Sequence, residues 1–404
     1  MGFGKYTYFF PSQMIEELVK HACSNGEDID IQLYFAGRHR ELYQALDAVD
    51  KHGMVAIGGY SSSGKTYLAL KLLDRLGVSV KNKPYHVTKE LINSDTPALG
   101  IMCEVNPSQS LVSFQNIFER LLQGSSGYHG LLALIGDTAL RRELNLKLSS
   151  LLLSNDSRDT MPIPNFNALL GILSEAISII KTQAAPKEII ICIDCIDRIE
   201  NTNALNDLVD CLQKAKVKLI FTFNTSLTYF PIHALAKHIP QLQSIYINRL
   251  TDEETDELID LIEANTKYSL HFDTKARNLL RLASGNIPYF VHFLCAPALV
   301  AAYQANKSII NENDVDLEIE NVRVGRYTSS YEKIYSAITE SPIQVDRLME
   351  YALMPNLDLC HHEPPSPQSS KFPVGGLLIF RDESFVIANP AIQVYARLRL
   401  GVKG

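Results

Sequence analysis

The sequence lacks any uninterrupted run of about 18 apolar residues, the length that a membrane-spanning helix needs. Its longest apolar stretch, 287–303, contains His292 and two prolines, which predicts a buried helix rather than a membrane span. The seven cysteines are scattered over 404 residues instead of forming a dense disulfide framework, and no signal-peptide pattern stands at the start. We therefore expect a cytoplasmic location and no membrane partner.

The chain also lacks an excess of positive charge. The net charge of −7 argues against nucleic-acid binding through the overall field, although it leaves room for a local basic patch. With 46% hydrophobic and 21% charged residues, the chain has enough apolar material for a sizeable core, which excludes a disordered protein. Its length suggests two or three domains. We find no internal repeat, and the Pro/Ser-rich segment 361–370 predicts a loop.

The segment 54–73 carries the most specific motif. An apolar, β-prone run at 54–57 ends in glycine, and a helical pattern at 67–73 follows the loop between them. Strand, glycine-rich loop and helix together predict a site in which backbone amides and the helix N-terminus hold a phosphate. A lysine adds a point charge and a threonine hydroxyl can ligate Mg²⁺. A turn that binds nothing is the alternative. The predicted ATP- or ADP-binding residues are Gly59, Ser61, Ser62, Ser63, Gly64, Lys65, Thr66 and Tyr67.

Strand and helix patterns alternate after this motif, which predicts an α/β domain with a mostly parallel sheet. The expected strands are 100–105, 188–194, 216–226 and 243–247. The expected helices are 42–51, 111–123, 131–153 and 165–181.

The strand at 188–194 is nearly all apolar, as a strand buried on both faces should be, and it ends in Asp194. An acid at that end, beside a phosphate loop, predicts a ligand for hydrated Mg²⁺. Cys192 and Cys195 match half of a zinc or redox motif. Because residues three apart on a strand point to opposite faces, and no second cysteine pair follows at a suitable spacing, we expect two small core residues instead.

Four features resemble STAND and AAA+ ATPases, the NACHT subgroup among them. The Gly37-Arg38 entry before a helix is similar to the start of such domains. Asp194-Cys195-Ile196-Asp197 resembles the second STAND motif, whereas AAA+ proteins have Glu directly after the aspartate. Gly285-Asn286-Ile287-Pro288 resembles the signature of the helical lid, with Ile287 inserted. The pattern of helices, hairpin and helix at 325–404 resembles a winged helix.

The resemblance implies a role for several residues. Asp194 would serve Mg²⁺, Lys65 would contact the outer phosphates, and Asp197 would orient the attacking water near the γ-phosphate. Asn224, which ends the strand at 216–226, would sense the γ-phosphate, unless it merely caps the next helix. Arg38 could reach the nucleotide or could be a surface arginine, and Pro288 would pack on the adenine.

The expected domains are an N-terminal helical segment (1–33), a P-loop ATPase core (34–248), a helical lid (249–324) and a winged-helix-like domain (325–404). The last has equal numbers of basic and acidic residues, whereas DNA-binding wings are usually more basic. A protein-contacting or autoinhibitory wing is therefore at least as well supported as a DNA-binding one.

The resemblance implies an ATP-binding and ATP-hydrolysing switch, whose nucleotide state controls assembly with copies of itself or binding of a separate effector or regulatory protein. Defence signalling is one setting in which such proteins act. The alternatives are a DNA-associated ATPase, similar to origin-recognition or transposition regulators, and a nucleotide-binding scaffold without hydrolysis, which Cys195 makes plausible.

Overall fold

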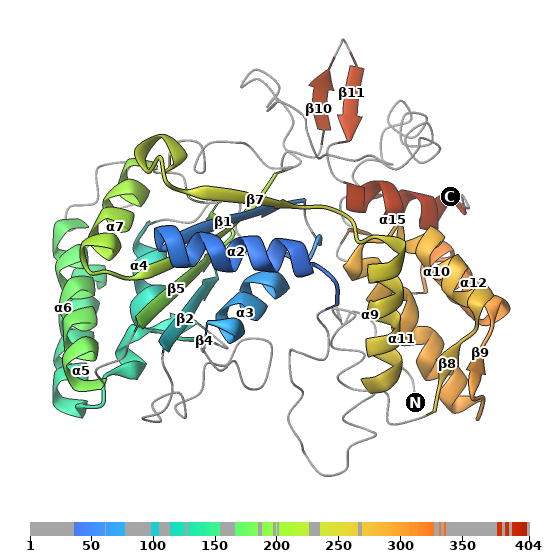
Figure 1. The fold of residues 1–404 in the computed structure, drawn as a ribbon, viewed down its shortest axis with the longest axis horizontal. Helices are drawn as coiled ribbons and strands as arrows, with labels where there is room; N and C mark the ends of the chain where they lie inside the picture. The colour runs from blue at the N-terminus through green and yellow to red at the C-terminus, as the bar shows by residue number, and fades with distance from the viewer. Residues whose placement is uncertain are drawn as a thin grey trace.

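The computed structural model describes residues 36–60, 62–76, 98–104, 114–125, 128–153, 166–184, 188–196, 199, 202–225, 235–265, 269–326, 331–332, 335–336, 378–381, 384–387 and 390–401. They form an α/β region and a helical region that lie side by side (Figure 1). None of the described helices is long and apolar enough to cross a membrane. The expected segment 1–33 lies outside the described residues, as do most of the helices expected between 325 and the hairpin of the winged-helix-like domain.

A five-stranded, all-parallel sheet forms the centre of the α/β region. Its strands are β1 (Met54–Gly59), β2 (Ala98–Glu104), β5 (Glu188–Asp194), β6 (Lys218–Asn224) and β7 (Gln243–Ile247), in the order β2-β5-β6-β1-β7. All six residues of β1 are buried, as are six of the seven of β5. The predicted α/β fold with a parallel sheet is therefore confirmed, and the apolar runs that predicted it are strands covered on both faces.

Helices cover the two faces of this sheet unequally. One face packs against α2 (His39–His52) and α3 (Lys65–Arg75). The other packs against α4 (Phe114–Leu122), α6 (Phe166–Ala184) and α7 (Thr202–Lys214), with α5 (Thr138–Leu153) lying on α6. The cause is topological. The connection from β1 to β2 runs in one direction across the sheet and all later connections run in the other, so right-handed crossovers place their helices on opposite faces.

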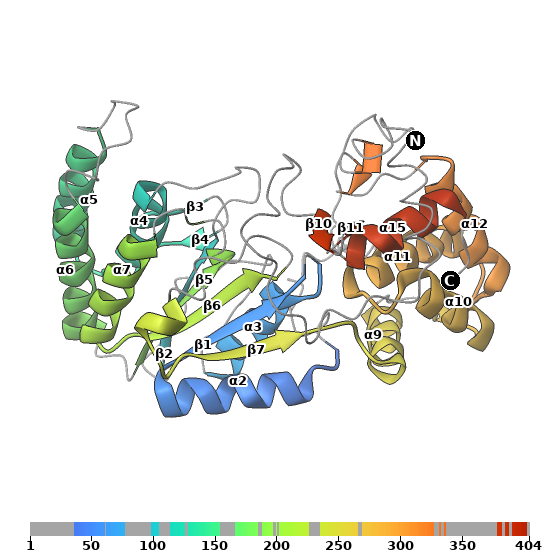
Figure 2. The ribbon, with the colours of Figure 1, turned by 90° about the horizontal axis from the view of Figure 1, so that it is seen from above.

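The carboxyl end of β1 lies where this direction reverses. In open α/β sheets, ligands bind outside the carboxyl ends of the strands at such a reversal, because the adjacent loops turn away to opposite faces. Figure 2 shows that this edge of the sheet faces the helical region. The fold therefore directs the predicted phosphate loop toward the helical region.

One predicted helix is wrong. Instead of a single helix over 131–153, the chain forms a short 3₁₀ helix, η3 (Leu131–Leu134), and then begins α5 at Thr138. Asp137 explains the break, because its Oδ1 accepts hydrogen bonds from the backbone N–H of Ala139 (2.8 Å) and of Leu140 (3.2 Å). An aspartate that satisfies these first amides starts a helix rather than continuing one. A two-stranded ribbon, β3 (Gly124–Ser125) with β4 (Tyr128–His129), precedes η3.

The helical region, where the sequence predicts a lid and which is called the lid below, contains α9 (Asp252–Asn265), α10 (Thr274–Ser284), α11 (Pro288–Gln304) and α12 (Glu312–Arg323), with a small parallel ribbon of β8 (His271–Phe272) and β9 (Ile309–Ile310). The Gly-Asn-Ile-Pro sequence separates α10 from α11. Gly285 there adopts φ 56°, a left-handed helix cap, and Pro288 begins α11, where its missing N–H costs nothing.

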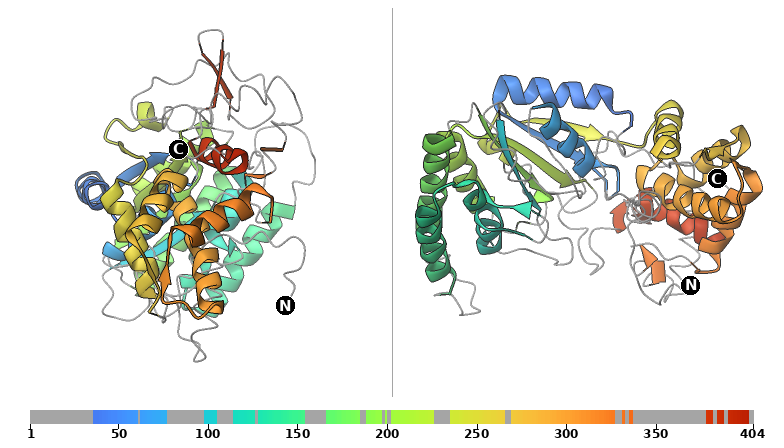
Figure 3. Two further views of the ribbon diagram at one scale, coloured as in Figure 1. Left: turned by 90° about the vertical axis from the view of Figure 1, so that its right-hand side faces the viewer. Right: turned by 90° about the horizontal axis from the view of Figure 1, so that it is seen from below.

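The last helix, α15 (Pro390–Leu400), also belongs to the core of the lid. Its buried side chains pack with those of α9 to α12 in one apolar cluster, which Ala36 and Tyr60 join from the α/β region. Figure 3 shows α15 against the lid helices, with the lid beside the sheet rather than over either of its faces. The expected hairpin is present before α15, as β10 (Leu378–Arg381) and β11 (Ser384–Ile387). Part of the segment 325–404 is thus fixed to the lid.

Candidate nucleotide site

The phosphate loop connects β1 to α3 and has the backbone that close packing requires. A Cβ on Gly59 would lie 2.6 Å from Ser63 Oγ and 2.8 Å from the Ile247 carbonyl oxygen, so only glycine fits there. Ser62 and Gly64 adopt left-handed φ values of 68° and 94°. These turns bring 62–66 back over the end of β1. Ser61 lies outside the described residues.

Lys65 points into the loop rather than to solvent. Its side chain is buried, and Nζ donates a hydrogen bond to the Tyr60 carbonyl oxygen (2.8 Å). The first intrahelical bond of α3 runs from the Leu68 N–H to the Gly64 carbonyl (3.0 Å), and the amides before Leu68 belong to the first turn, where a helix offers them no acceptor. Ser63 Oγ is buried and has no hydrogen-bond partner among the described residues. A lysine charge, first-turn amides and this hydroxyl suit a phosphate.

A buried acid lies beside the loop, as predicted. Asp194 ends β5, and its two carboxylate oxygens are 3.2 and 3.1 Å from Thr66 Oγ1. Thr222 Oγ1, on β6, donates to Asp194 Oδ1 as well. Burial raises the pKa of Asp194, against the opposing effect of the Thr222 hydrogen bond and the positive charge of Lys65. A buried carboxylate beside a threonine hydroxyl is an oxygen donor set that fits Mg²⁺, which commonly binds proteins through one or two carboxylates and substrate phosphates.

The chain leaves the sheet immediately after Asp194. Cys195 adopts φ 64°, and its backbone N–H donates to Thr222 Oγ1 (2.9 Å). Asp197 could approach the loop only if the chain turned at this point, and that turn is present. Asp197 itself lies outside the described residues, so its role stays a prediction.

Asn224 is the last residue of the neighbouring strand, β6. It is half-buried at the end of β6 and pairs in register with Gly59, the first residue of the phosphate-loop motif. The next backbone amide, Thr225 N–H, donates to the Gly59 carbonyl (3.0 Å). The structure therefore brings Gly59, the 62–66 loop, Asp194 and Asn224 to one end of three adjacent strands.

Arg38 is not a surface side chain. It is only 5% exposed, and its guanidinium donates to the carbonyl oxygens of Ser63 (3.3 Å), Asn248 and Arg249 (3.5 Å). Its backbone N–H donates to Glu254 Oε1, on α9 (2.7 Å). Arg38 thus joins the phosphate loop, the chain segment after β7 and the first turn of α9.

Pro288 and Tyr331, which belong to the lid and its apolar cluster, also approach the loop. Pro288 Cγ lies 3.8 Å from the position that a Cβ on Gly64 would occupy. From the other side, Tyr67 of α3 packs against the lid cluster. The hydroxyls of Tyr331 and Ser62 are 2.7 Å apart. Sequence reasoning missed Thr222 and Tyr331. A signal existed for Thr222, a lone hydroxyl inside an otherwise apolar strand, but none existed for Tyr331.

No group of three or more His, Cys, Asp or Glu side chains with metal-binding geometry occurs in the part of the chain that the structure describes. The predicted Mg²⁺ site does not need one, since it would combine Thr66 and Asp194 with phosphate oxygens.

No protein-family model matches the sequence, and no curated protein matches it. Among solved structures, the chain is similar to the Walker-type ATPase PABY2304 of Pyrococcus abyssi, at a TM-score of 0.49 and 11% identity, over 90% of this chain and 96% of that one. It is similar to the ORC2 protein of Aeropyrum pernix, solved as ADPNP–ADP complexes, at 0.46 and 10%, over 93% and 96%. It is also similar to the RuvB Holliday junction branch migration motor of Thermotoga maritima, at 0.44 and 13%, over 88% and 94%.

Proposed function

We propose that this chain is an ATP-binding and ATP-hydrolysing switch of the STAND/AAA+ type. The observation that carries the proposal is the contact between Thr66, at the start of α3, and the buried carboxylate of Asp194, beside a loop that encloses the Lys65 ammonium group. A buried carboxylate whose pKa is raised by desolvation destabilises a protein, so its presence at this edge of the sheet favours a ligand-binding role.

The residues have distinct roles in this proposal. The loop amides and Lys65 hold the phosphates of ATP or ADP, and Thr66 and Asp194 hold Mg²⁺. When bound, Mg²⁺ neutralises charge on the phosphate oxygens. Asn224 contacts the γ-phosphate, Asp197 orients the attacking water, and Pro288 packs against the adenine.

The position of the lid supports a switch. Arg38 and Glu254 join the phosphate loop to α9, and Pro288 approaches the loop from α11. A ligand shifts such an arrangement only if it binds one state more tightly than the other. We propose that the γ-phosphate supplies this difference, and that the chain then assembles with copies of itself or binds a separate effector or regulatory protein.

Mass photometry with ADP, ATP and a slowly hydrolysed ATP analogue, each with Mg²⁺, tests the switch. We expect one oligomeric state with ADP and a larger one with the analogue. Identical mass distributions in all three nucleotides, at saturating concentrations confirmed by thermal shift, would contradict a switch but not nucleotide binding.

Hydrolysis is tested separately. Asp197→Asn should keep ATP affinity and slow turnover by roughly 10- to 1,000-fold if Asp197 orients the water. Asp207→Asn, on the exposed surface of α7, is the matched control and should leave turnover unchanged. An unchanged rate in Asp197→Asn at saturating ATP would favour a nucleotide-binding scaffold or another catalytic acid.

DNA association is the second outcome to examine. The arginines of α15 do not favour it, because Arg397 is buried and Arg399 is bonded to Glu332 and to carbonyl oxygens of α12. DNA binding by the full chain that weakens steeply with salt would nevertheless support a DNA-associated ATPase.

A further inference from the structure

A hydrogen bond joins the phosphate loop to the C-terminal part of the chain. Ser62 Oγ and the Tyr331 hydroxyl lie 2.7 Å apart, although the two residues are 269 positions apart in the sequence. Ser62 adopts φ 68°, a region that serine seldom occupies. The contact with Tyr331 therefore helps to hold the loop in a conformation that is unfavourable by itself.

Aromatic packing fixes the Tyr331 ring in place. The side chain is 5% exposed, and its ring stacks on Phe290 (centroids 5.9 Å apart) and meets the Tyr289 ring edge-on (5.8 Å). The ring of Tyr395, on α15, lies 6.5 Å away. A ring held by three others has little freedom, so its hydroxyl is directed at the loop and cannot follow Ser62 if the loop moves.

The residue after Tyr331 is bonded to α15. Glu332 accepts a hydrogen bond from the Tyr395 hydroxyl, and its Oε1 lies 3.4 Å from Arg399 Nη2. Arg399 Nη1 also donates to the Val322 carbonyl at the end of α12 (3.0 Å). A continuous series of contacts thus runs from the phosphate loop, through residues 331 and 332, to α15 and α12.

We propose that Tyr331 is a positioning residue of the nucleotide site, and that it couples the conformation of the phosphate loop to α15. The idea rests on the proposed nucleotide-binding function. In it, Tyr331 holds Ser62 so that the loop is ready for the phosphates of ADP or ATP. Because coupling between two sites is reciprocal, bound nucleotide must stabilise the Ser62–Tyr331 contact by the same factor, and hence α15.

A double-mutant cycle with a fluorescent ADP analogue and Mg²⁺ tests whether Tyr331 positions the phosphate loop through Ser62. Tyr331→Phe and Ser62→Ala each remove the same hydrogen bond, and Phe keeps the aromatic packing. Each should weaken ADP binding by about fivefold, as the loss of one neutral hydrogen bond predicts. The double variant should then also bind about fivefold more weakly, because no second bond is left to lose. Tyr43→Phe, on a side chain 73% exposed on α2, is the control and should bind as the wild type does.

Hydrogen–deuterium exchange tests whether bound nucleotide stabilises α15 through the Ser62–Tyr331 contact. ADP should slow exchange of the α15 amides in the wild type and in Tyr43→Phe, but not in Tyr331→Phe or Ser62→Ala. The amides of α6, on the far face of the sheet, provide the internal reference. Point variants are preferable to deleting 325–404, because the deletion would also remove α15 from the lid core.

The outcomes separate the two proposals. If the wild type does not bind the ADP analogue, nucleotide binding and coupling both fall. If it binds, but Tyr331→Phe keeps wild-type affinity and α15 protection, coupling alone is overturned. If Tyr331→Phe and Ser62→Ala each bind about fivefold more weakly but the double variant binds about 25-fold more weakly, as independent effects predict, the two side chains do not act through their shared hydrogen bond and coupling is again overturned.

Discussion

The sheet region and the lid each contain a buried carboxylate, and the two carboxylates have different kinds of partner. Asp194, 3% exposed at the end of β5, accepts hydrogen bonds from the hydroxyls of Thr66 and Thr222. Glu263, 8% exposed on α9, is 2.8 Å from Arg277 Nη2 and accepts a hydrogen bond from the Phe272 backbone N–H (2.7 Å). The lid pairs its buried acid with a guanidinium, whereas the hydrogen bonds to the buried acid of the sheet come from neutral groups.

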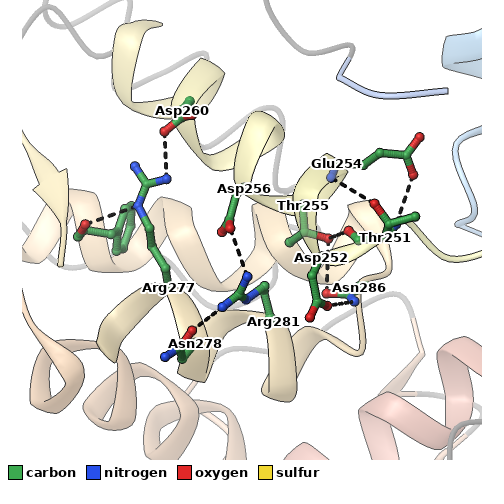
Figure 4. Close-up of polar contacts among 11 residues, drawn as sticks. Thr251, Asp252, Glu254, Thr255, Asp256, Asp260, Arg277, Asn278, Arg281 and Asn286 are labelled. Atoms are coloured by element: carbon green, nitrogen blue, oxygen red, sulfur yellow. Dashed lines mark hydrogen bonds and ion pairs between the residues drawn. The ribbon is translucent and has the colours of Figure 1, made fainter. Parts of the chain in front are cut away.

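The other polar contacts between α9 and the α10 segment also give each acidic side chain a partner within the protein (Figure 4). Arg277 pairs with Asp260 (2.7 Å) and Arg281 with Asp256 (2.9 Å). The Asn286 amide donates to Asp252 Oδ1 (2.7 Å). Charges that the protein pairs by itself are structural. A carboxylate held by hydroxyls, near a loop that can hold an anion, is instead ready for a cation. This difference separates candidate site residues from structural ones.

The largest effect should come from the lysine of the loop. Lys65→Ala should weaken ATP binding by roughly 100- to 1,000-fold, since a charge-assisted contact to phosphate is lost. Thermal shift should lose most of its ATP-dependent rise, while the free protein melts close to the wild type. Lys71→Ala is a matched control, because Lys71 is equally buried on α3 but pairs with Asp74 (3.6 Å). An equal loss in both variants would remove the special role of Lys65.

Lowering the pH should destabilise the folded protein through His292, which is buried on α11 of the lid. Burial lowers the pKa of His292 from 6.5 to about 4. Between these values the unfolded chain binds a proton that the folded chain excludes, so stability is complete above pH 6.5 and is lost as the pH falls toward 4. The loss amounts to about 3 kcal/mol.

Urea unfolding at several pH values measures this loss. His292→Leu should flatten the dependence on pH between 6.5 and 4, whereas His52→Gln, on the exposed end of α2, should leave it as in the wild type. The same slope in His292→Leu and the wild type would show that His292 does not cause it.

Substituting the two buried acids tests the comparison directly. Glu263→Gln should lower stability by about 2 kcal/mol, since the variant leaves Arg277 without part of its counter-charge, and it should keep nucleotide affinity. Asp194→Asn should abolish the Mg²⁺ dependence of nucleotide binding, yet the free protein should be more stable than the wild type at pH 7.

The sign follows from the raised pKa of Asp194. A carboxyl group whose pKa is higher in the folded state stabilises the protein below its ordinary value of 3.8 and loses that contribution as the pH rises. The advantage of Asp194→Asn should therefore shrink toward pH 4. If Asp194→Asn instead loses stability at pH 7 and keeps its Mg²⁺ response, Asp194 is a structural acid like Glu263.

Much of the sheet was predictable because its signals are local. Strands buried on both faces appear as short apolar runs, so 188–194 and 243–247 were predicted with the bounds that β5 and β7 have. The phosphate loop was predictable for the same reason, since its strand, glycines and helix are contiguous. The break before α5 was missed because the Leu pattern continues across it, although Asp137 marked the boundary.

The contacts around the loop could not be predicted, since they join segments that are far apart in the sequence. Arg38 bonds the carbonyl oxygen of Asn248, and Tyr331 bonds Ser62. A backbone carbonyl leaves no trace in a sequence, and a tyrosine in an apolar cluster has the same pattern whether or not its hydroxyl has a distant partner. Sequence reasoning found the residues that would touch the nucleotide more readily than those that position the loop.

The smallest predicted effect is a difference in ATP affinity between variants at two helix caps of the lid. At α9, Thr251 Oγ1 accepts from the Glu254 N–H (3.2 Å), and Glu254 Oε2 accepts from the Thr251 N–H (2.9 Å). At α12, Asn311 and Asp314 form the equivalent capping box. Thr251→Ala and Asn311→Ala should each cost about 1 kcal/mol of stability. They should differ in ATP affinity, because the other oxygen of Glu254 accepts the Arg38 N–H, and the Arg38 guanidinium reaches the phosphate loop. Thr251→Ala should weaken ATP binding by about twofold, as a fraction of one hydrogen bond predicts, and Asn311→Ala should leave it unchanged.

Isothermal titration at a temperature where both variants are fully folded measures the difference. Equal ATP affinities in the two variants would show that α9 supports the lid without positioning Arg38, and the contact between lid and loop would then depend on Pro288 and Tyr331.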